Sequence, residues 1–274
     1  MQQAARATFF LSTGRCGTQW FHDTLPKVCG GGAVITHEPL LGDYRPKRHL
    51  RNAAGLAEDA RFQAHLSEVT RLLDDGRPYI ETGWPCDPAV PLFVDRLGNR
   101  AGFVHLVRNP VNVALSLATH RVYARDDWIG TGALDPFDPG VVQKDLAARW
   151  EGMTDYERTL FWWTEVNLYI EELKRECPDH EFLLVRYEDF FDPLNDEPVQ
   201  ALGRFVGLSD DAALDRHRAR NVDRFRYVMP PVDWELIFDY PVTCALAERL
   251  GYGTEVLRSA ATAGAYEHYN AAAI

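Results

Sequence analysis

The chain has 274 residues, of which 46% are hydrophobic, so it is long and apolar enough to bury a full core; its formal net charge is −11. Nucleic acids and anionic membranes bind basic faces, so this acidity argues against both as partners. Five cysteines without a C-x-x-C pair are typical of reduced thiols in a cytoplasmic protein, and we expect no signal peptide, no membrane span and no metal site.

Short apolar runs alternate with helical patterns along the chain. We predict strands at 8–11, 33–35, 79–81, 103–107 and 182–185, and helices from just after Gly17 to near Pro26 and over 56–73, 110–120 and 156–175. This alternation predicts an α/β fold, a P-loop-like three-layer architecture with a central parallel β-sheet flanked by helices, in a single domain over 1–274.

Two of these segments need further interpretation. A stretch rich in Asp, Gly and Pro at 126–140 predicts a lid or acceptor loop near 121–150. The aromatic residues of the helix at 156–175 cover most of its circumference, which favours core packing over a base-stacking platform.

The first predicted strand ends in a turn that has the composition of an anion-binding loop. Gly14 and Gly17 let the backbone approach a ligand closely, and the start of the following helix leaves N–H groups for an anion. Arg15 adds a permanent planar charge suited to phosphate or sulfate oxygens. The loop lacks the lysine of a Walker A motif and is not G-x-G-x-x-G, so neither common nucleotide motif describes it. An ordinary strand-to-helix turn with an exposed arginine is the alternative.

A second strand-to-helix junction, at 103–116, points to the same edge of the sheet. Pro110 suits the first turn of a helix, and apolar residues recur after it at helical spacing. Arg108 at the strand end and Ser116 two turns into the helix can therefore reach one pocket. A solvent-facing arginine and an ordinary helical serine are the alternative.

Together the two junctions resemble the donor-binding motifs of sulfotransferases that use 3′-phosphoadenylyl sulfate (PAPS). Arg15-Cys16-Gly17-Thr18-Gln19-Trp20 is similar to their 5′-phosphosulfate loop, Lys/Arg-Ser-Gly-Thr-Thr-Trp/Leu, and Arg108 with Ser116 is similar to their 3′-phosphate motif. The resemblance implies that Arg15 faces the bridging oxygen and sulfuryl group, that Thr18 and Gln19 contact the 5′-phosphate, and that Trp20 stacks on adenine.

A weaker third match involves Arg186-Tyr187-Glu188-Asp189, which resembles a family segment whose tyrosine approaches the adenine. Closing the strand and capping the next helix is an equally good role for this segment. The donor-binding residues implied by the three matches are Gly14, Arg15, Cys16, Gly17, Thr18, Gln19, Trp20, Arg108, Ser116 and Tyr187.

The catalytic base distinguishes two branches of the family. The cytosolic phenol and steroid branch places a histidine after a strand, where this chain has Gly83. The carbohydrate-type branch uses a glutamate in a Glu-Pro-Leu context, and the segment 36–40, Thr-His-Glu-Pro-Leu, resembles it, so the chain is closer to the carbohydrate-type and bacterial branch. We therefore expect Glu38 to accept the acceptor's proton, with Arg15 stabilising charge on the bridging oxygen.

Two alternatives to this assignment remain at the level of sequence. Glu81 is the reserve candidate for the base, and a structural salt bridge is the alternative role for Glu38. If the strand persists through Glu38, alternation predicts that His37 points away from the acceptor, because neighbouring residues of a strand face opposite sides and only one of the pair should face it.

The expected activity is transfer of a sulfuryl group from PAPS to a hydroxyl or amine of a small-molecule, sugar or lipid acceptor by in-line displacement. The product would be adenosine 3′,5′-bisphosphate (PAP), and no metal is needed. A nucleotide kinase-like phosphotransferase and a non-catalytic nucleotide-binding protein of the same fold are the alternatives.

Three features stay open in the sequence. Trp84, His120, Tyr123 and Trp128 are candidates for the acceptor pocket by position. The basic cluster at 216–226 either replaces a late 3′-phosphate segment of the family or forms a solvated helix face. Neither the acceptor's identity nor the oligomeric state follows from the sequence.

Overall fold

A parallel five-stranded sheet forms the centre of the molecule. In a computed structural model of the chain, whose described residues are 5–29, 32–44, 49–124, 133–208, 214, 216 and 232–259, the strands are β1 (Ala7–Leu11), β2 (Val34–His37), β3 (Tyr79–Thr82), β4 (Ala101–Val107) and β5 (Glu181–Arg186). Their order is β2-β3-β1-β4-β5, and every neighbouring pair is parallel. All carboxyl ends therefore meet at one edge, where ligands bind in open α/β sheets.

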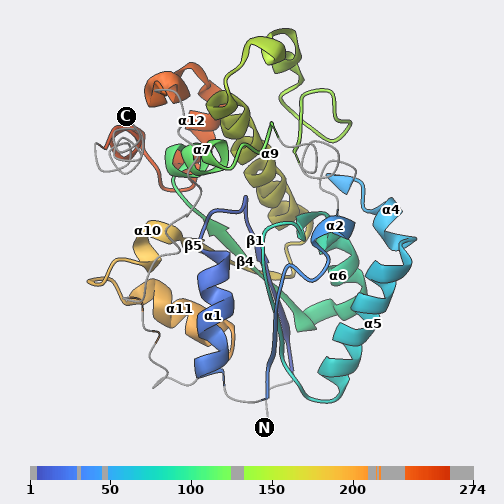
Figure 1. Ribbon diagram of the computed structural model, residues 1–274. Helices are drawn as coiled ribbons and strands as arrows, with labels where there is room; N and C mark the ends of the chain where they lie inside the picture. Colours follow the sequence, from blue (N-terminus) through green and yellow to red (C-terminus); the bar gives the residue numbers. More distant parts are fainter. Residues whose placement is uncertain are drawn as a thin grey trace.

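Helices cover both faces of the sheet (Figure 1). α1 (Thr18–Val28), α10 (Tyr187–Phe190) and α11 (Glu197–Phe205) lie on one side, and α5 (Ala60–Asp74) and α6 (Val90–Leu97) lie on the other. α9 (Asp155–Glu176) packs against α7 (Pro110–Thr119). The remaining described elements are α2 (Leu41–Tyr44), α4 (Ala54–Ala57), α12 (Pro241–Arg249), α13 (Thr254–Leu257) and the 3₁₀ helices Asp87–Ala89, Gly98–Arg100, Lys144–Gly152 and Trp234–Asp239.

Aromatic side chains fill the core between the sheet and its helices. Phe9 of β1 stacks on Phe93 of α6 with ring centroids 3.8 Å apart, and Trp162 and Trp163 of α9 are fully buried. β1 and β4 are buried along their whole length, as expected of central strands in a parallel sheet covered on both faces. The prediction that the aromatic residues of 156–175 pack in the core is confirmed.

The five predicted strands are confirmed, with ends that differ by at most two residues. Two predicted helices differ from the structure. α1 continues past Pro26, because the Cys29 N–H still bonds the carbonyl of Leu25 at 2.9 Å and closes a further turn. The helix predicted over 56–73 is two helices, α4 and α5, because the Asp59 side chain accepts the N–H groups of Arg61 and Phe62 and so caps a new helix.

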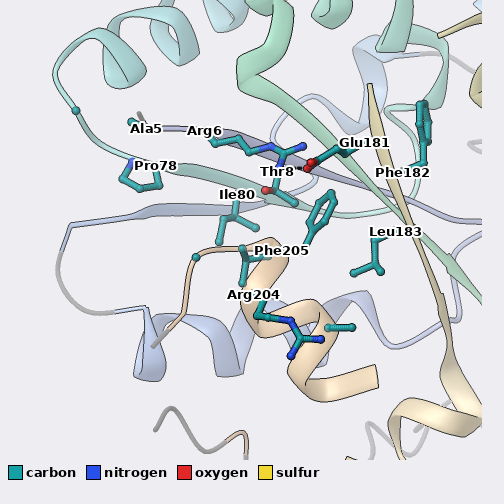
Figure 2. A pocket seen from close by; sticks show the side chains of 14 residues that line it. Ala5, Arg6, Thr8, Pro78, Ile80, Glu181, Phe182, Leu183, Arg204 and Phe205 are labelled. Carbon is teal, nitrogen blue, oxygen red and sulfur yellow. Dashed lines mark hydrogen bonds and ion pairs between the residues drawn. The ribbon is translucent and has the colours of Figure 1, made fainter. Parts of the chain in front are cut away.

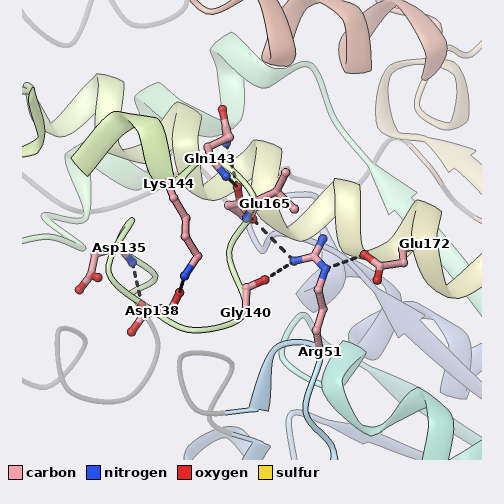
Figure 3. Close-up of polar contacts among 9 residues, drawn as sticks. Arg51, Asp135, Asp138, Gly140, Gln143, Lys144, Glu165 and Glu172 are labelled. Carbon is pink, nitrogen blue, oxygen red and sulfur yellow. Dashed lines mark hydrogen bonds and ion pairs between the residues drawn. The ribbon is translucent and has the colours of Figure 1, made fainter. Parts of the chain in front are cut away.

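A buried carboxylate fastens the segment before α9 to that helix (Figure 3). Glu165 is fully buried and accepts the backbone N–H groups of Val142 and Gln143 at 2.9 and 2.8 Å. Arg51 donates to the carbonyl of Gly140 at 2.6 Å and lies 3.7 Å from Glu165. Hydrogen bonds to an ionised group are about twice as strong as neutral ones, so residues 140–143 are held firmly. Residues 125–132 of the lid predicted near 121–150 lie outside the described residues, and the lid stays a prediction.

A large cavity opens at the amino edge of the sheet, where the strands begin (Figure 2). Its volume is about 790 Å³, and residues of β1, β5 and α11 contribute to its walls. Arg6 forms an ion pair with Glu181 across it, and the Arg6 guanidinium lies 4.7 Å from the centroid of the Phe205 ring. The lining includes none of the predicted donor-binding residues. Within the described part of the chain, no helix is both long enough and apolar enough to cross a bilayer.

Candidate active site

A second, smaller cavity lies at the carboxyl edge of the sheet. Its volume is about 230 Å³. The segments that follow β1, β2 and β3 meet there with the end of α7, so four parts of the chain far apart in sequence line one space. The lining residues are Thr13, Gly14, Arg15, Thr18, Gln19, His37, Glu38, Trp84, Leu117, His120 and Val122.

The loop after β1 turns through the left-handed region of backbone conformation. Gly14, Arg15 and Gly17 have φ values of 76°, 58° and 88°. Glycine adopts this conformation without strain, whereas Arg15 is held in it by its surroundings. A Cβ at position 17 would also lie 3.1 Å from Cε2 of Tyr187, so a larger residue there would be both strained in its backbone and crowded by Tyr187.

The start of α1 is suited to an anion. Gly17 occupies its N-cap position without a side-chain hydrogen bond, and no acidic residue lies in the first turn. The helical bonds begin at the N–H of Trp20, which reaches the carbonyl of Gly17 at 2.9 Å, so the N–H groups of Thr18 and Gln19 have no acceptor within the helix. A partial positive charge of about half a unit collects at such an end. The Gln19 side chain donates to Asp23 at 3.0 Å. An anion at the helix start would therefore be met by the backbone N–H of Gln19 and not by its side chain.

Two arginines from separate motifs converge beside this helix start. Arg15 donates from Nε to the hydroxyl of Ser116 at 2.9 Å, and Arg108 donates from Nη1 to the carbonyl of Arg15 at 2.9 Å. The Arg108 guanidinium also lies 4.5 Å from the centroid of the Tyr187 ring. The structure therefore brings together the residues of all three sequence matches.

Sequence reasoning missed the groups that hold these loops in place. The indole N–H of Trp162 donates to the carbonyl of Thr13 at 3.0 Å, and that of Trp163 donates to the carbonyl of Arg108 at 3.1 Å. One helix, α9, thus supports both donor loops through adjacent tryptophans. Each indole N–H finds its partner when buried, as tryptophan usually does. The signal was present as a Trp-Trp pair, which the sequence analysis assigned to the core.

The acidic turn after β5 supports the second loop. Glu188 accepts the N–H of Asn109 at 3.0 Å with one carboxylate oxygen and the hydroxyl of Tyr252 at 2.7 Å with the other. Asn109 in turn caps α7 by accepting the N–H of Val111 at 3.0 Å. The segment 186–189 therefore positions the Arg108 loop, besides presenting Tyr187 to it.

Cys16 and Trp20 are buried and do not belong to the lining of the cavity. Burial raises the pKa of the Cys16 thiol to about 11, and its Sγ donates to the carbonyl of Gly14 at 3.2 Å, so it braces the loop from inside. The Trp20 ring is buried and meets Phe190 and Phe191 edge-on, with centroids 5.6 and 5.0 Å apart. The adenine-stacking role implied for Trp20 stays a prediction.

Glu38 is presented to the cavity by a break in its strand. β2 ends at His37, and Glu38 has a φ of 48°, in the left-handed region, while its N–H donates to the carbonyl of Thr82 at 3.1 Å. Burial, followed by the nearby charge of Glu81, raises the pKa of the Glu38 carboxyl to about 7. A carboxyl group with a pKa near neutrality is well matched to general-base catalysis.

Gly83 makes room for that carboxylate. A Cβ at position 83 would lie 2.8 Å from Cγ of Glu38, a distance that real Cβ contacts almost never show. A histidine at position 83, which the cytosolic branch carries there, is therefore incompatible with the observed placement of Glu38. The sequence marked both residues without revealing that they touch.

The expectation that His37 points away from the acceptor side is wrong. His37 lines the cavity together with Glu38, and its Nε2 lies 3.6 Å from Oε1 of Glu38. Side-chain alternation holds only while the strand continues, and the left-handed conformation at Glu38 ends it.

Glu81, the reserve candidate, is bound within the sheet. Glu81 is 1% exposed, and its carboxylate accepts hydrogen bonds from the hydroxyls of Tyr44 at 2.6 Å and Tyr79 at 2.9 Å. Nε2 of His65 lies 3.1 Å from the same carboxylate. Glu81 does not belong to the cavity lining. Glu38 is therefore the carboxylate that an acceptor in the cavity can reach.

The acceptor candidates divide in a similar way. Trp84 and His120 line the cavity, whereas Tyr123 donates to the carbonyl of Leu134 at 2.6 Å outside its lining. Trp128 lies outside the described residues.

The basic cluster at 216–226 is described only at its first residue. Arg216 donates to the carbonyls of Asp192 and Asn195 at 2.6 and 2.8 Å, and residues 217–226 lie outside the described residues. Across the described ranges, no group of three or more His, Cys, Asp or Glu side chains has a metal-binding arrangement.

Comparisons with known proteins agree with this architecture. The sulfotransferase from Alicyclobacillus acidocaldarius superposes with a TM-score of 0.53 at 17% identity, covering 93% of this chain and 100% of that one. The sulfotransferase domain from the curacin biosynthetic pathway superposes with a TM-score of 0.52 at 15% identity, covering 90% and 98%. No protein-family model and no curated protein sequence matches the chain. The chain thus has the fold of these sulfotransferase structures, and the expected three-layer α/β architecture is confirmed.

Proposed function

We propose that the protein is a sulfotransferase that moves a sulfuryl group from PAPS to a hydroxyl or amine of a small-molecule, sugar or lipid acceptor. The observation that carries the proposal is the convergence of Arg15, Arg108 and Ser116 beside the uncapped start of α1. This arrangement suits a doubly phosphorylated nucleotide, because each end of such a molecule needs its own cationic, hydrogen-bonding partner. The shared fold supports the proposal.

The donor's two anionic ends are assigned to different groups. The backbone N–H groups at the start of α1, with Arg15, suit the 5′-phosphosulfate. Arg108 and Ser116 suit the 3′-phosphate, with Tyr187 packed on the Arg108 guanidinium. Because the chain is acidic overall, positive charge concentrated at this place favours specific binding of an anion over nonspecific anion binding.

Glu38 is assigned as the base. The acceptor's O–H or N–H proton passes to the Glu38 carboxylate as the acceptor atom forms its bond to sulfur and the bond from sulfur to the bridging oxygen breaks. The electron pair of the broken bond stays on the released phosphate, where Arg15 offsets the growing charge. Burial of Glu38 makes its carboxylate a stronger base than an exposed one.

The test has two stages. Calorimetric titration with PAP should show saturable 1:1 binding without added metal, and ATP with Mg²⁺ should bind more weakly. Labelled PAPS is then incubated with a panel of alcohols, sugars and amines, and transfer to at least one of them is expected. Tighter binding of ATP with Mg²⁺ than of PAP would favour the phosphotransferase alternative and contradict the proposal. PAP binding without transfer to any acceptor would favour the non-catalytic alternative.

A further inference from the structure

His37 lies beside the proposed base, and both line the cavity. Its Nε2 is 3.6 Å from Oε1 of Glu38, and its Nδ1 is 3.1 Å from the hydroxyl oxygen of Thr82. The ring of His22, from α1, lies beside it with centroids 5.4 Å apart. The side chains of His37 and Glu38 are each 19% exposed, so both reach the cavity without being surrounded by solvent.

The hydrogen bonds around His37 favour one tautomer of its ring. The Thr82 hydroxyl donates to the carbonyl of Thr36 at 3.1 Å, so its single hydrogen is already used. Its oxygen can then only accept, and the hydrogen toward it belongs to Nδ1 of His37. A neutral imidazole with its proton on Nδ1 has a lone pair on Nε2. That lone pair is on the ring nitrogen nearest the carboxyl of Glu38.

We propose that His37 is a positioning residue that relays the proton taken up by Glu38 out of the site, an inference that rests on the proposed function of Glu38. After transfer, the proton sits on Oε1 of Glu38. The Oε1–H bond breaks as an Nε2–H bond forms on His37, which gives an imidazolium ion and regenerates the carboxylate. The imidazolium then releases one proton to solvent through the exposed part of its ring. No other reactant is required.

The surroundings keep the imidazole neutral between turnovers. Burial, followed by the neighbouring His22, lowers the pKa of His37, whereas a hydrogen bond to the backbone of Thr82 and the carboxylates of Asp23 and Glu81 act in the opposite direction. Glu38 also faces the ring, at the distance given above. His37 therefore carries the relayed proton only in passing, which suits a relay because an imidazolium with a lowered pKa loses its proton readily.

The relay also answers a need created by the site itself. A carboxyl with a pKa of about 7 holds its proton more strongly than an ordinary carboxyl, and it must lose that proton in every turnover. With an acceptor bound in the cavity of about 230 Å³, less solvent reaches the Glu38 carboxyl from the cavity side. His37, at the end of β2, gives the proton on Glu38 a second route to solvent.

The experiment compares two substitutions of His37 with a control. His37→Asn places an amide N–H near Thr82 and removes the group at Nε2, and His37→Ala opens a space that free imidazole can fill. We expect both to lower kcat about a hundredfold while PAP affinity and the melting temperature stay at the wild-type values. Added imidazole should restore about tenfold of the loss in His37→Ala and none in Glu38→Gln. His180→Asn, at the turn before β5, should match the wild type.

The outcomes decide the question in either direction. Wild-type kcat in His37→Asn, or a loss that imidazole does not restore in His37→Ala, overturns the relay, as does a matching loss of PAP affinity. A separate readout does not depend on transfer: nitrogen-15 NMR of the wild-type protein near neutral pH should show His37 protonated on Nδ1 and bare on Nε2. The opposite tautomer overturns the relay even if sulfate transfer is observed. An enzyme without transfer to any acceptor contradicts the proposed function and leaves the NMR result to decide the geometry.

Discussion

The two cavities at opposite edges of the sheet differ in the charged groups that line them and in how those groups are paired. The amino-edge cavity, at about 790 Å³, is more than three times the volume of the carboxyl-edge cavity, at about 230 Å³. Yet its Arg6 is paired with Glu181 and packed on Phe205. The smaller cavity combines an uncapped helix start, Arg15 and a carboxyl with a raised pKa. Chemistry and strand direction, and not volume, therefore identify the candidate site.

Removing the proposed base is the strongest way to break this contrast. Glu38→Gln should lower kcat about a hundredfold to ten-thousandfold, because no group accepts the acceptor's proton. PAP affinity measured by calorimetry should remain unchanged, since the amide keeps the shape of the carboxylate. Glu81→Gln is the comparison variant, and a collapse of turnover in that variant alone would move the base to β3.

Crowding the same carboxylate tests its placement. Gly83→Ala puts a Cβ about where the Glu38 side chain now lies, 2.8 Å from its Cγ. We expect kcat to fall about a hundredfold, because small misplacements of a reacting group have effects of that size. Steady-state kinetics should show the loss, with PAP affinity retained. An unchanged kcat would mean that the Glu38 position is not critical.

The donor arginines allow a direct comparison between the two cavities. Arg15→Ala and Arg108→Ala should each weaken PAP binding by about tenfold to a hundredfold, corresponding to about 1.5–3 kcal/mol for a charge-assisted hydrogen bond. Arg6→Ala, at the amino edge, serves as the matched control and should bind PAP as the wild type does. Equal losses in all three variants would erase the distinction between the cavities.

The pH dependence gives the smallest expected effect. The Glu38 carboxyl is raised to a pKa of about 7, and the base acts only when ionised, so kcat should rise with pH through about 7. Between pH 6 and pH 8 the increase should be about tenfold. A profile that is already flat from pH 5 upward would show that a group with an ordinary carboxyl pKa is the base.

The donor loops could be predicted because their signals are local. Gly14, Arg15 and Gly17 lie within four residues, and both glycines adopt the left-handed backbone that glycine permits. Arg108 and Ser116 could be placed at the same edge because strands that alternate with helices run parallel. The strand positions followed from apolar runs, which tertiary packing then shifted only slightly.

What the sequence could not predict depends on contacts between distant segments. The tryptophans of α9 donate to the carbonyls of Thr13 and Arg108, but a Trp-Trp pair in the sequence does not indicate which carbonyls will accept these hydrogen bonds. His37 was assigned to the wrong side because strand alternation assumes that the strand continues. The left-handed turn at Glu38 is set by its N–H bond to Thr82 of β3, a contact 44 positions away along the chain.

A crystal structure with PAP bound would test the central claim most directly. We predict the 5′-phosphate at the start of α1 beside Arg15, the 3′-phosphate on Arg108 and Ser116, and Glu38 facing the space next to the 5′-phosphate. PAP in the amino-edge cavity, or bound at the carboxyl edge without contact to either arginine, would contradict the account.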